Sequence, residues 1–135
     1  MNGLFASMIC AAIIAFAAIS DEGNILTPAE AAQAQLDAYN ARDIDAFVAV
    51  YSENVQAFTH PNTLRFEGND ELRRRYRPYF DKTPDLHVEV TKRMVQGNFV
   101  IDAEEGVANG HRFTAIAIYQ MNPGTGKIDK VWFIQ

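Results

Sequence analysis

His60 is the residue of this chain whose type and position best suit proton transfer. It follows an expected short strand and stands directly before Pro61. An imidazole titrates near neutral pH, so His60 is a candidate general acid or base. The alternative is a loop histidine without a chemical role, because the sequence does not show which carboxylate would orient the ring. His87 and His111 are expected on exposed strand faces.

A run of arginines between residues 73 and 77 offers chemistry of another kind, the binding of an anion. However, Asp70 precedes Arg74 by four residues, and Glu71 stands in the same relation to the next arginine. Acidic residues in that position favour ion pairs along an exposed helix. We therefore expect a solvated helix face, with anion binding as the alternative.

The acidic residues Asp102, Glu104 and Glu105 form a possible metal site. Strand alternation places Asp102 and Glu104 on one face, with no histidine expected near them. We expect this face to be exposed to solvent. The single cysteine, Cys10, provides no cysteine and histidine cage. The sequence therefore predicts no metal site, and we expect no cofactor.

Composition limits the classes of function. The 135 residues are 48% hydrophobic and 21% charged, which is typical of one packed domain and excludes a disordered or low-complexity protein. Seventeen acidic against twelve basic residues give a net charge of −5, so no nucleic-acid partner is expected.

Residues 1–26 form a segment separate from the domain expected over residues 27–135. An uncharged, largely apolar run extends from residue 4 to residue 19. The run is short for a membrane span, and its small residues resemble a signal-peptide cleavage site, although a positively charged head is missing. A signal peptide would direct the protein to the periplasm or the exterior. The alternatives are a packed extension of a cytoplasmic protein and a retained anchor, and only an anchor would make the membrane a partner.

The domain begins with segments of helical periodicity. A capping box at Thr27 and Glu30, with Pro28 at the first helical position, predicts a helix that continues to Ala41. The pattern then predicts, in chain order, a second helix over residues 44–51 capped by Asp43, strands over 55–59 and 64–67, and a third helix over 70–80 capped by Asn69.

Beyond residue 85 the period changes from helical to alternating. Compact turn signals rich in glycine and asparagine separate the alternating segments, which predicts an antiparallel meander. Helices followed by such a sheet define the α+β class, with the helices covering one sheet face. The expected strands span residues 86–90, 99–107, 111–121 and 127–134.

Both faces of the strand over residues 111–121 carry apolar side chains. Ile116 and Ile118 lie on the face opposite Phe113 and Tyr119. A sheet covered by helices on one side should be polar on the other. We therefore expect a homodimer through the outer sheet face, to which Trp132 and a neighbouring isoleucine on the last strand contribute.

From residue 27 onward the chain resembles the nuclear-transport-factor-2-like superfamily, in particular its SnoaL-like and ketosteroid-isomerase-like branch. The segments AQLDAYNARDIDAFVAVYSENV, FEGNDELRRRY and GKIDKVWFI carry this resemblance. It implies a cone-shaped, curved antiparallel sheet wrapped around three N-terminal helices, the cystatin-like α+β barrel, with an apolar pocket and frequent dimers. It does not imply one activity, because the scaffold hosts isomerases, cyclases, dehydratases and proteins without chemistry.

The ketosteroid-isomerase pattern is incomplete in this sequence. The position of the base falls on Thr59 or His60, and that of the first-helix tyrosine on Gln35. The position of the protonated acid falls on Ala117, which has no polar group, and only Tyr76 matches a supporting tyrosine. Steroid isomerisation is therefore disfavoured.

These observations predict a pocket protein that binds a small hydrophobic, oxygen-bearing molecule. The alternative is a cofactor-free isomerase or lyase with His60 as acid or base and with Tyr76 and Gln35 as hydrogen-bond donors. The candidate ligand-binding residues are Gln35, Tyr39, Tyr51, Phe58, Tyr76, Phe113, Ala117, Tyr119 and Phe133.

Overall fold

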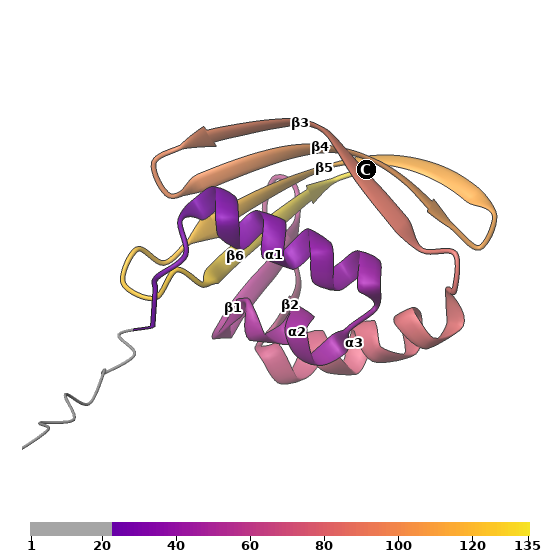
Figure 1. Cartoon of the computed structure of the whole chain (residues 1–135), viewed down its shortest axis with the longest axis horizontal. Coiled ribbons are helices and arrows are strands. Elements are labelled where there is room, and N and C mark those ends of the chain that lie inside the picture. The colour runs from indigo at the N-terminus through magenta and orange to yellow at the C-terminus, as the bar shows by residue number, and fades with distance from the viewer. Residues whose placement is uncertain (1–22) are drawn as a thin grey trace, which may run out of the picture.

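Within residues 23–135, three helices lie against the concave side of a curved, six-stranded sheet (Figure 1). The computed structural model describes residues 23–135, so the signal-peptide prediction lies outside the described residues. The expected α+β class and curved sheet are confirmed. The elements are α1 (Pro28–Ala41), α2 (Ile44–Ala49), β1 (Tyr51–Thr59), β2 (Thr63–Glu67), α3 (Asn69–Lys82), β3 (His87–Gln96), β4 (Phe99–Ala108), β5 (His111–Met121) and β6 (Ile128–Ile134).

Side-chain caps fix the beginnings of α1 and α2. The Thr27 hydroxyl accepts from the Glu30 N–H at 3.3 Å, and the Glu30 carboxylate accepts from the Thr27 N–H at 2.9 Å. α1 ends at Ala41 and is capped by Arg42, whose φ of 53° is left-handed. Asp43 then accepts from the Ala46 N–H at 3.0 Å and begins α2. Both caps were predicted. None of the helices within residues 23–135 has the length and apolarity that a membrane span requires.

Several boundaries differ from the sequence prediction, and the largest difference at a strand end is in β3, which continues to Gln96 where the strand was expected to end at residue 90. α2 ends at Ala49 and β1 already begins at Tyr51, where a helix was expected. Tyr51 pairs with Ile128 of β6, so this long-range pairing outweighs the local helical spacing. The residue that caps α3 is Gly68 and not Asn69, because the backbone there has a φ of 93°, which favours glycine.

The sheet has the strand order β2-β1-β6-β5-β4-β3. Strands β3 to β6 form the predicted antiparallel meander. The β1–β6 pair is parallel, which the sequence analysis did not predict. This pair joins the two halves of the chain and brings β2, at the edge of the sheet, beside the helices.

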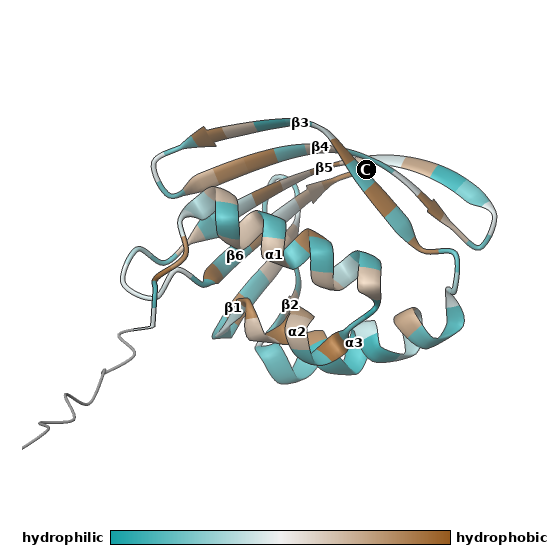
Figure 2. Cartoon of the chain, viewed as in Figure 1, coloured by the Kyte–Doolittle hydropathy of each residue, from teal (hydrophilic) through white to brown (hydrophobic). Residues whose placement is uncertain are grey.

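The core fills the space between the helices and the concave sheet face. Phe47 of α2, Leu72 of α3 and Val100 of β4 are buried there. In contrast, α3 is hydrophilic over most of its length (Figure 2). Two of its arginines pair with Glu71, which confirms the expected Glu71–Arg75 pair, whereas Arg74 pairs with Glu71 and not with Asp70 as expected.

Candidate functional site

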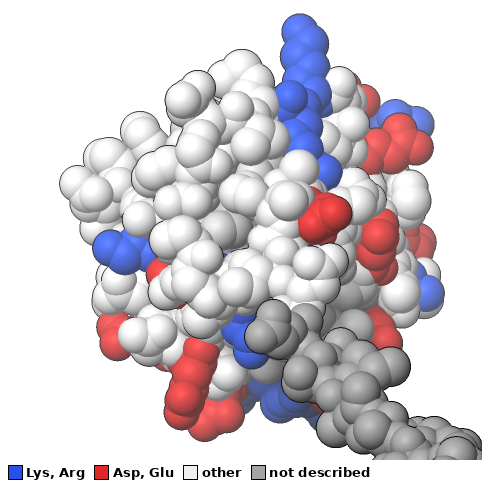
Figure 3. Space-filling view, turned by 60° about the vertical axis from the view of Figure 1, so that its left-hand side comes forward, with Lys and Arg blue, Asp and Glu red and all other residues white. Residues whose placement is uncertain are grey.

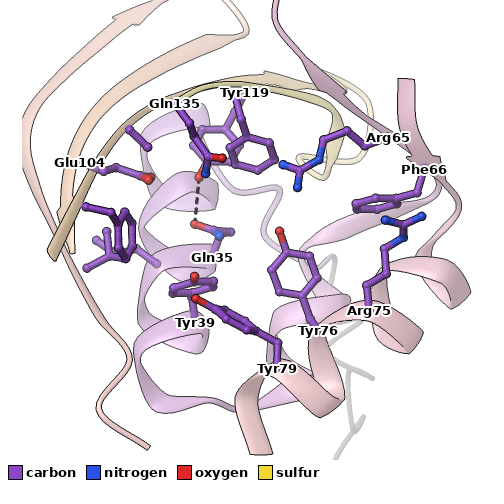
Figure 4. A pocket seen from close by; sticks show the side chains of 15 residues that line it. Gln35, Tyr39, Arg65, Phe66, Arg75, Tyr76, Tyr79, Glu104, Tyr119 and Gln135 are labelled. Carbon is purple, nitrogen blue, oxygen red and sulfur yellow. Dashed lines mark hydrogen bonds between the residues drawn. The ribbon is translucent and has the colours of Figure 1, made fainter. Parts of the chain in front are cut away.

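A cavity of about 350 Å³ opens between α1, α3 and the concave face of the sheet (Figure 4). Its volume is within the range of small-molecule sites. Seven of its fifteen lining residues are aromatic, and they come from both the helices and the strands. It is lined by Gln35, Leu36, Tyr39, Arg65, Phe66, Arg75, Tyr76, Tyr79, Val88, Glu104, Phe113, Ala115, Tyr119, Phe133 and Gln135.

The structure brings six of the nine predicted ligand-binding residues together in this lining. Gln35 and Tyr39 come from successive turns of α1, and Tyr76 comes from α3. The other three are contributed by the last two strands, namely Phe113, Tyr119 and Phe133. Their shared location follows from the way the sheet curves around α1. Their role in binding a ligand stays a prediction.

Three predicted residues lie elsewhere. Tyr51 packs in the core, with its ring centroid 5.1 Å from that of Phe47. Ala117 is fully buried in the same core. Phe58 stacks on Trp132, because these two residues pair across β1 and β6 on the outer sheet face. None of the three lines the cavity.

His60 also lies outside the cavity lining. It is exposed in the turn between β1 and β2, where its backbone N–H donates to the Phe133 carbonyl at 2.9 Å. β1 ends at Thr59, so His60 lies beyond the end of the strand. The structure therefore places a loop histidine here, as the alternative interpretation expected.

The expected exposure of Asp102 and Glu104 is wrong. Asp102 is only 1% exposed, and Glu104 lines the cavity. The two do share a strand face, as alternation predicted, but this face is turned towards α1. Val100 and Gly106, which alternate with them, are buried on the same face.

An ion pair makes the burial of Asp102 possible. The Arg93 guanidinium donates to both carboxylate oxygens of Asp102, at 2.7 and 2.9 Å. It also donates to Gln33 of α1 at 3.0 Å. A bidentate pair with satisfied hydrogen bonds compensates for much of the cost of removing the charges from water. Within residues 23–135, no group of three or more histidine, cysteine or acidic side chains is arranged to hold a metal ion.

Burial and the neighbouring charge of Asp102 raise the pKa of Glu104 from 4.5 to about 7. The charge of Arg93 opposes this change but does not cancel it. A carboxyl with such a pKa is present in both protonation states near pH 7. It can therefore donate or accept a proton at physiological pH.

Tyrosine hydroxyls also line the cavity. The Tyr119 hydroxyl donates to Gln35 Oε1 at 3.2 Å, the hydrogen bond drawn in Figure 4. Burial raises the pKa of Tyr76 to about 12, and it raises those of Tyr39 and Tyr119 further. These hydroxyls remain protonated at neutral pH and can serve as hydrogen-bond donors to a ligand oxygen.

Two arginines stand on the side of the cavity away from Glu104 (Figure 4). The guanidinium of Arg65 lies 5.4 Å from the centroid of the Phe133 ring, and that of Arg75 lies 5.0 Å from the centroid of Phe66. Both contacts are within the range of cation–π interactions.

Sequence reasoning missed Glu104, both arginines and Tyr79 as cavity residues. One signal for Glu104 was present in β4. The residues at 100, 102, 104 and 106 alternate with 101, 103 and 105, and the first set contains Val100 and Gly106. An apolar residue and a residue without a side chain on the acidic face indicate packing against a neighbour.

Comparisons with known proteins agree with this architecture. A family model described as a SnoaL-like domain matches residues 32–131. No curated protein matches the chain in sequence. Among solved structures, an uncharacterized cystatin fold protein from Novosphingobium aromaticivorans is 24% identical, with a TM-score of 0.74 over 82% of this chain and 99% of that protein.

Two further solved structures have names that refer to chemistry. SalBIII, an epoxide hydrolase/cyclase-like enzyme of pyran ring formation in the polyether salinomycin, is 20% identical, with a TM-score of 0.68 over 79% of this chain and 88% of its own. A protein described as a SnoaL-like polyketide cyclase from Shewanella denitrificans is 9% identical, with a TM-score of 0.69 over the same shares. At these identities the likeness shows a common fold alone.

Proposed function

This chain belongs to the SnoaL-like domain family, and from its cavity we propose that it is an acid–base catalyst for a small, largely apolar molecule with a carbonyl or hydroxyl oxygen. The observation that carries the proposal is Glu104, a carboxyl with a pKa of about 7 in the wall of an aromatic cavity. The proposal gives the role once considered for His60 to Glu104, because only the carboxyl lines the cavity.

The proposed step is the removal of a proton from a carbon next to a carbonyl group. The ionised Glu104 takes the proton, and the electron pair of the C–H bond moves to the carbonyl oxygen. Tyr76, whose hydroxyl points into the cavity in Figure 4, donates a hydrogen bond to the resulting enolate oxygen. Return of the proton to another atom completes an isomerisation, and departure of a neighbouring leaving group completes an elimination.

The names of two similar structures support this class of reaction. SalBIII is called an epoxide hydrolase/cyclase-like enzyme, and the Shewanella protein is called a polyketide cyclase. Both descriptions concern oxygen-bearing carbon skeletons. The substrate of this chain is a proposal, since the likeness extends to the fold only.

Hydrogen–deuterium exchange of a ketone tests the proposal. We propose 1-tetralone, a bicyclic ketone, in heavy water at pH 8, with exchange at the carbon beside the carbonyl followed by NMR. The wild-type protein should accelerate exchange, Glu104→Gln should abolish the acceleration, and the matched variant His60→Ala should retain it. Exchange at the same rate with and without wild-type protein would overturn the proposed chemistry, and an active Glu104→Gln variant would exclude Glu104 as the base.

We also propose that the protein is a homodimer through its outer sheet face. Cross-strand pairing aligns one apolar row over five neighbouring strands on this face. Figure 3 brings forward the side with the β3–β4 turn and shows a wide surface there with few charged side chains. The row consists of Phe58, Trp132, Ile118, Ile101 and Met94, of which Met94 is 63% exposed.

Light scattering after size-exclusion chromatography measures the oligomeric state. The wild-type chain should have the mass of a dimer at micromolar concentration. Ile118→Asp should produce a monomer, because it places a charge at the centre of the row. Arg77→Asp, on the exposed side of α3, is the control and should remain dimeric. A monomeric wild type would contradict this assignment.

A further inference from the structure

The two cavity arginines differ in whether a carboxylate pairs with them. The Arg75 guanidinium pairs with Glu71 at 2.8 Å. Arg65 has no carboxylate within 4.0 Å among residues 23–135. Arg65 therefore contributes a positive charge to the cavity that no described side chain neutralises.

Contacts hold the Arg65 side chain at the cavity. Its guanidinium lies over the Phe133 ring at 5.4 Å and turns into the cavity in Figure 4. A planar guanidinium offers parallel N–H donors that suit the two oxygens of a carboxylate.

The opposite side of the cavity carries acidic groups instead of a positive charge. Glu104 is there, and Asp102 is close enough to raise its pKa. An anionic group is therefore disfavoured beside Glu104 and favoured beside Arg65. Between these two ends the wall is apolar and aromatic, with Tyr39 and Phe113.

We propose that the ligand of this cavity carries a carboxylate, bound by Arg65, on an apolar ring body that extends towards Glu104. The inference rests on the proposed function in taking the cavity as the ligand site, and it adds the chemical class of the ligand. It does not depend on any reaction taking place. It assigns Arg65 as the residue that selects carboxylates over neutral molecules of the same shape.

Calorimetry with 2-naphthoate and 2-naphthamide tests this selectivity. The two probes share one ring body and differ in the charge of a single group. At pH 6 most of Glu104 is protonated, so it does not repel the anion. We expect 2-naphthoate to bind about tenfold more tightly than 2-naphthamide, since hydrogen bonds between charged groups exceed neutral ones by about that factor.

Variants of Arg65 separate its charge from its shape. Arg65→Gln should bind both probes equally, with the affinity for 2-naphthamide unchanged. Arg65→Lys should retain part of the preference, because it keeps the charge without the planar fork. Arg74→Gln, a change at an exposed arginine of α3 outside the cavity lining, is the matched control and should behave as the wild type. Thermal melting of each variant verifies that it is folded.

Three results would overturn the inference, and the third would also contradict the proposed function. Equal affinity of the wild type for the two probes would show that the cavity does not select an anion. An undiminished preference in Arg65→Gln would remove Arg65 from the site. Failure of both probes to bind would also contradict the proposed function, because an aromatic cavity of this volume should accept a bicyclic ring.

Discussion

Replacement of Glu104 by glutamine tests the electrostatics of the cavity through stability. The change keeps the size and the hydrogen-bonding capacity of the side chain and removes its charge. Folding raises the pKa of this carboxyl from 4.5 to about 7. The native state therefore binds the proton more tightly than the unfolded state does. As a result, this group lowers the free energy of unfolding as pH rises from about 4.5 to 7.

The size of the effect follows from the pKa shift. A change of one pKa unit corresponds to about 1.4 kcal/mol, so the shift of Glu104 amounts to about 3 kcal/mol once both states are ionised. At pH 8 the Glu104→Gln protein should be more stable than the wild type by about 3 kcal/mol from this effect. At pH 5 the gain should be below about 1 kcal/mol, because the native carboxyl is still protonated.

Urea denaturation at pH 5 and pH 8 measures this difference, at one protein concentration so that association does not contribute. Glu105→Gln is the matched control, since it removes the adjacent carboxyl on the exposed face of β4. This control should change stability by the same small amount at both pH values. The reasoning is refuted if Glu104→Gln has an equal effect at pH 5 and pH 8, or if it is less stable than the wild type at pH 8.

Three further substitutions test the surroundings of the cavity by urea denaturation. Arg93→Met should lower the free energy of unfolding by about 3 to 5 kcal/mol, because it leaves the charge of Asp102 buried without its partner; a loss below 1 kcal/mol would contradict the pair. Gly106→Ala should cost about 1 to 3 kcal/mol, since its Cβ would lie 2.3 Å from the Phe113 ring, and Phe113→Leu should reduce that cost. Asn40→Ala should cost about 1 to 3 kcal/mol, because the Asn40 amide bonds both an N–H and a carbonyl of β3; an unchanged midpoint would show that water replaces it.

The local features of the fold were predictable from the sequence. Thr27 and Asp43 cap helices in the predicted way, because caps depend on a few neighbouring residues. The meander followed from alternation and turn residues. The parallel β1–β6 pair was not predictable in this way, since it joins residues such as Tyr51 and Ile128 that are far apart in sequence.

The cavity was predictable in part. Helical spacing placed Gln35 and Tyr39 on one side of α1, and the structure places both in the cavity lining. Alternation grouped Asp102 with Glu104, yet it does not determine which face of a strand is buried. That choice depends on the packing of β4 against α1 and on Arg93, whose charge permits a buried carboxylate. An acidic strand face is normally exposed, so local reasoning led to the wrong side.

The protonation of Glu104 is the central claim of this account, and NMR can follow it directly. The side-chain carboxyl carbon of Glu104, assigned by comparison with Glu104→Gln in carbon-13-labelled protein, reports ionisation through its chemical shift between pH 4 and pH 9. We predict a midpoint near pH 7. A midpoint near 4.5, the ordinary value for a glutamate, would contradict it.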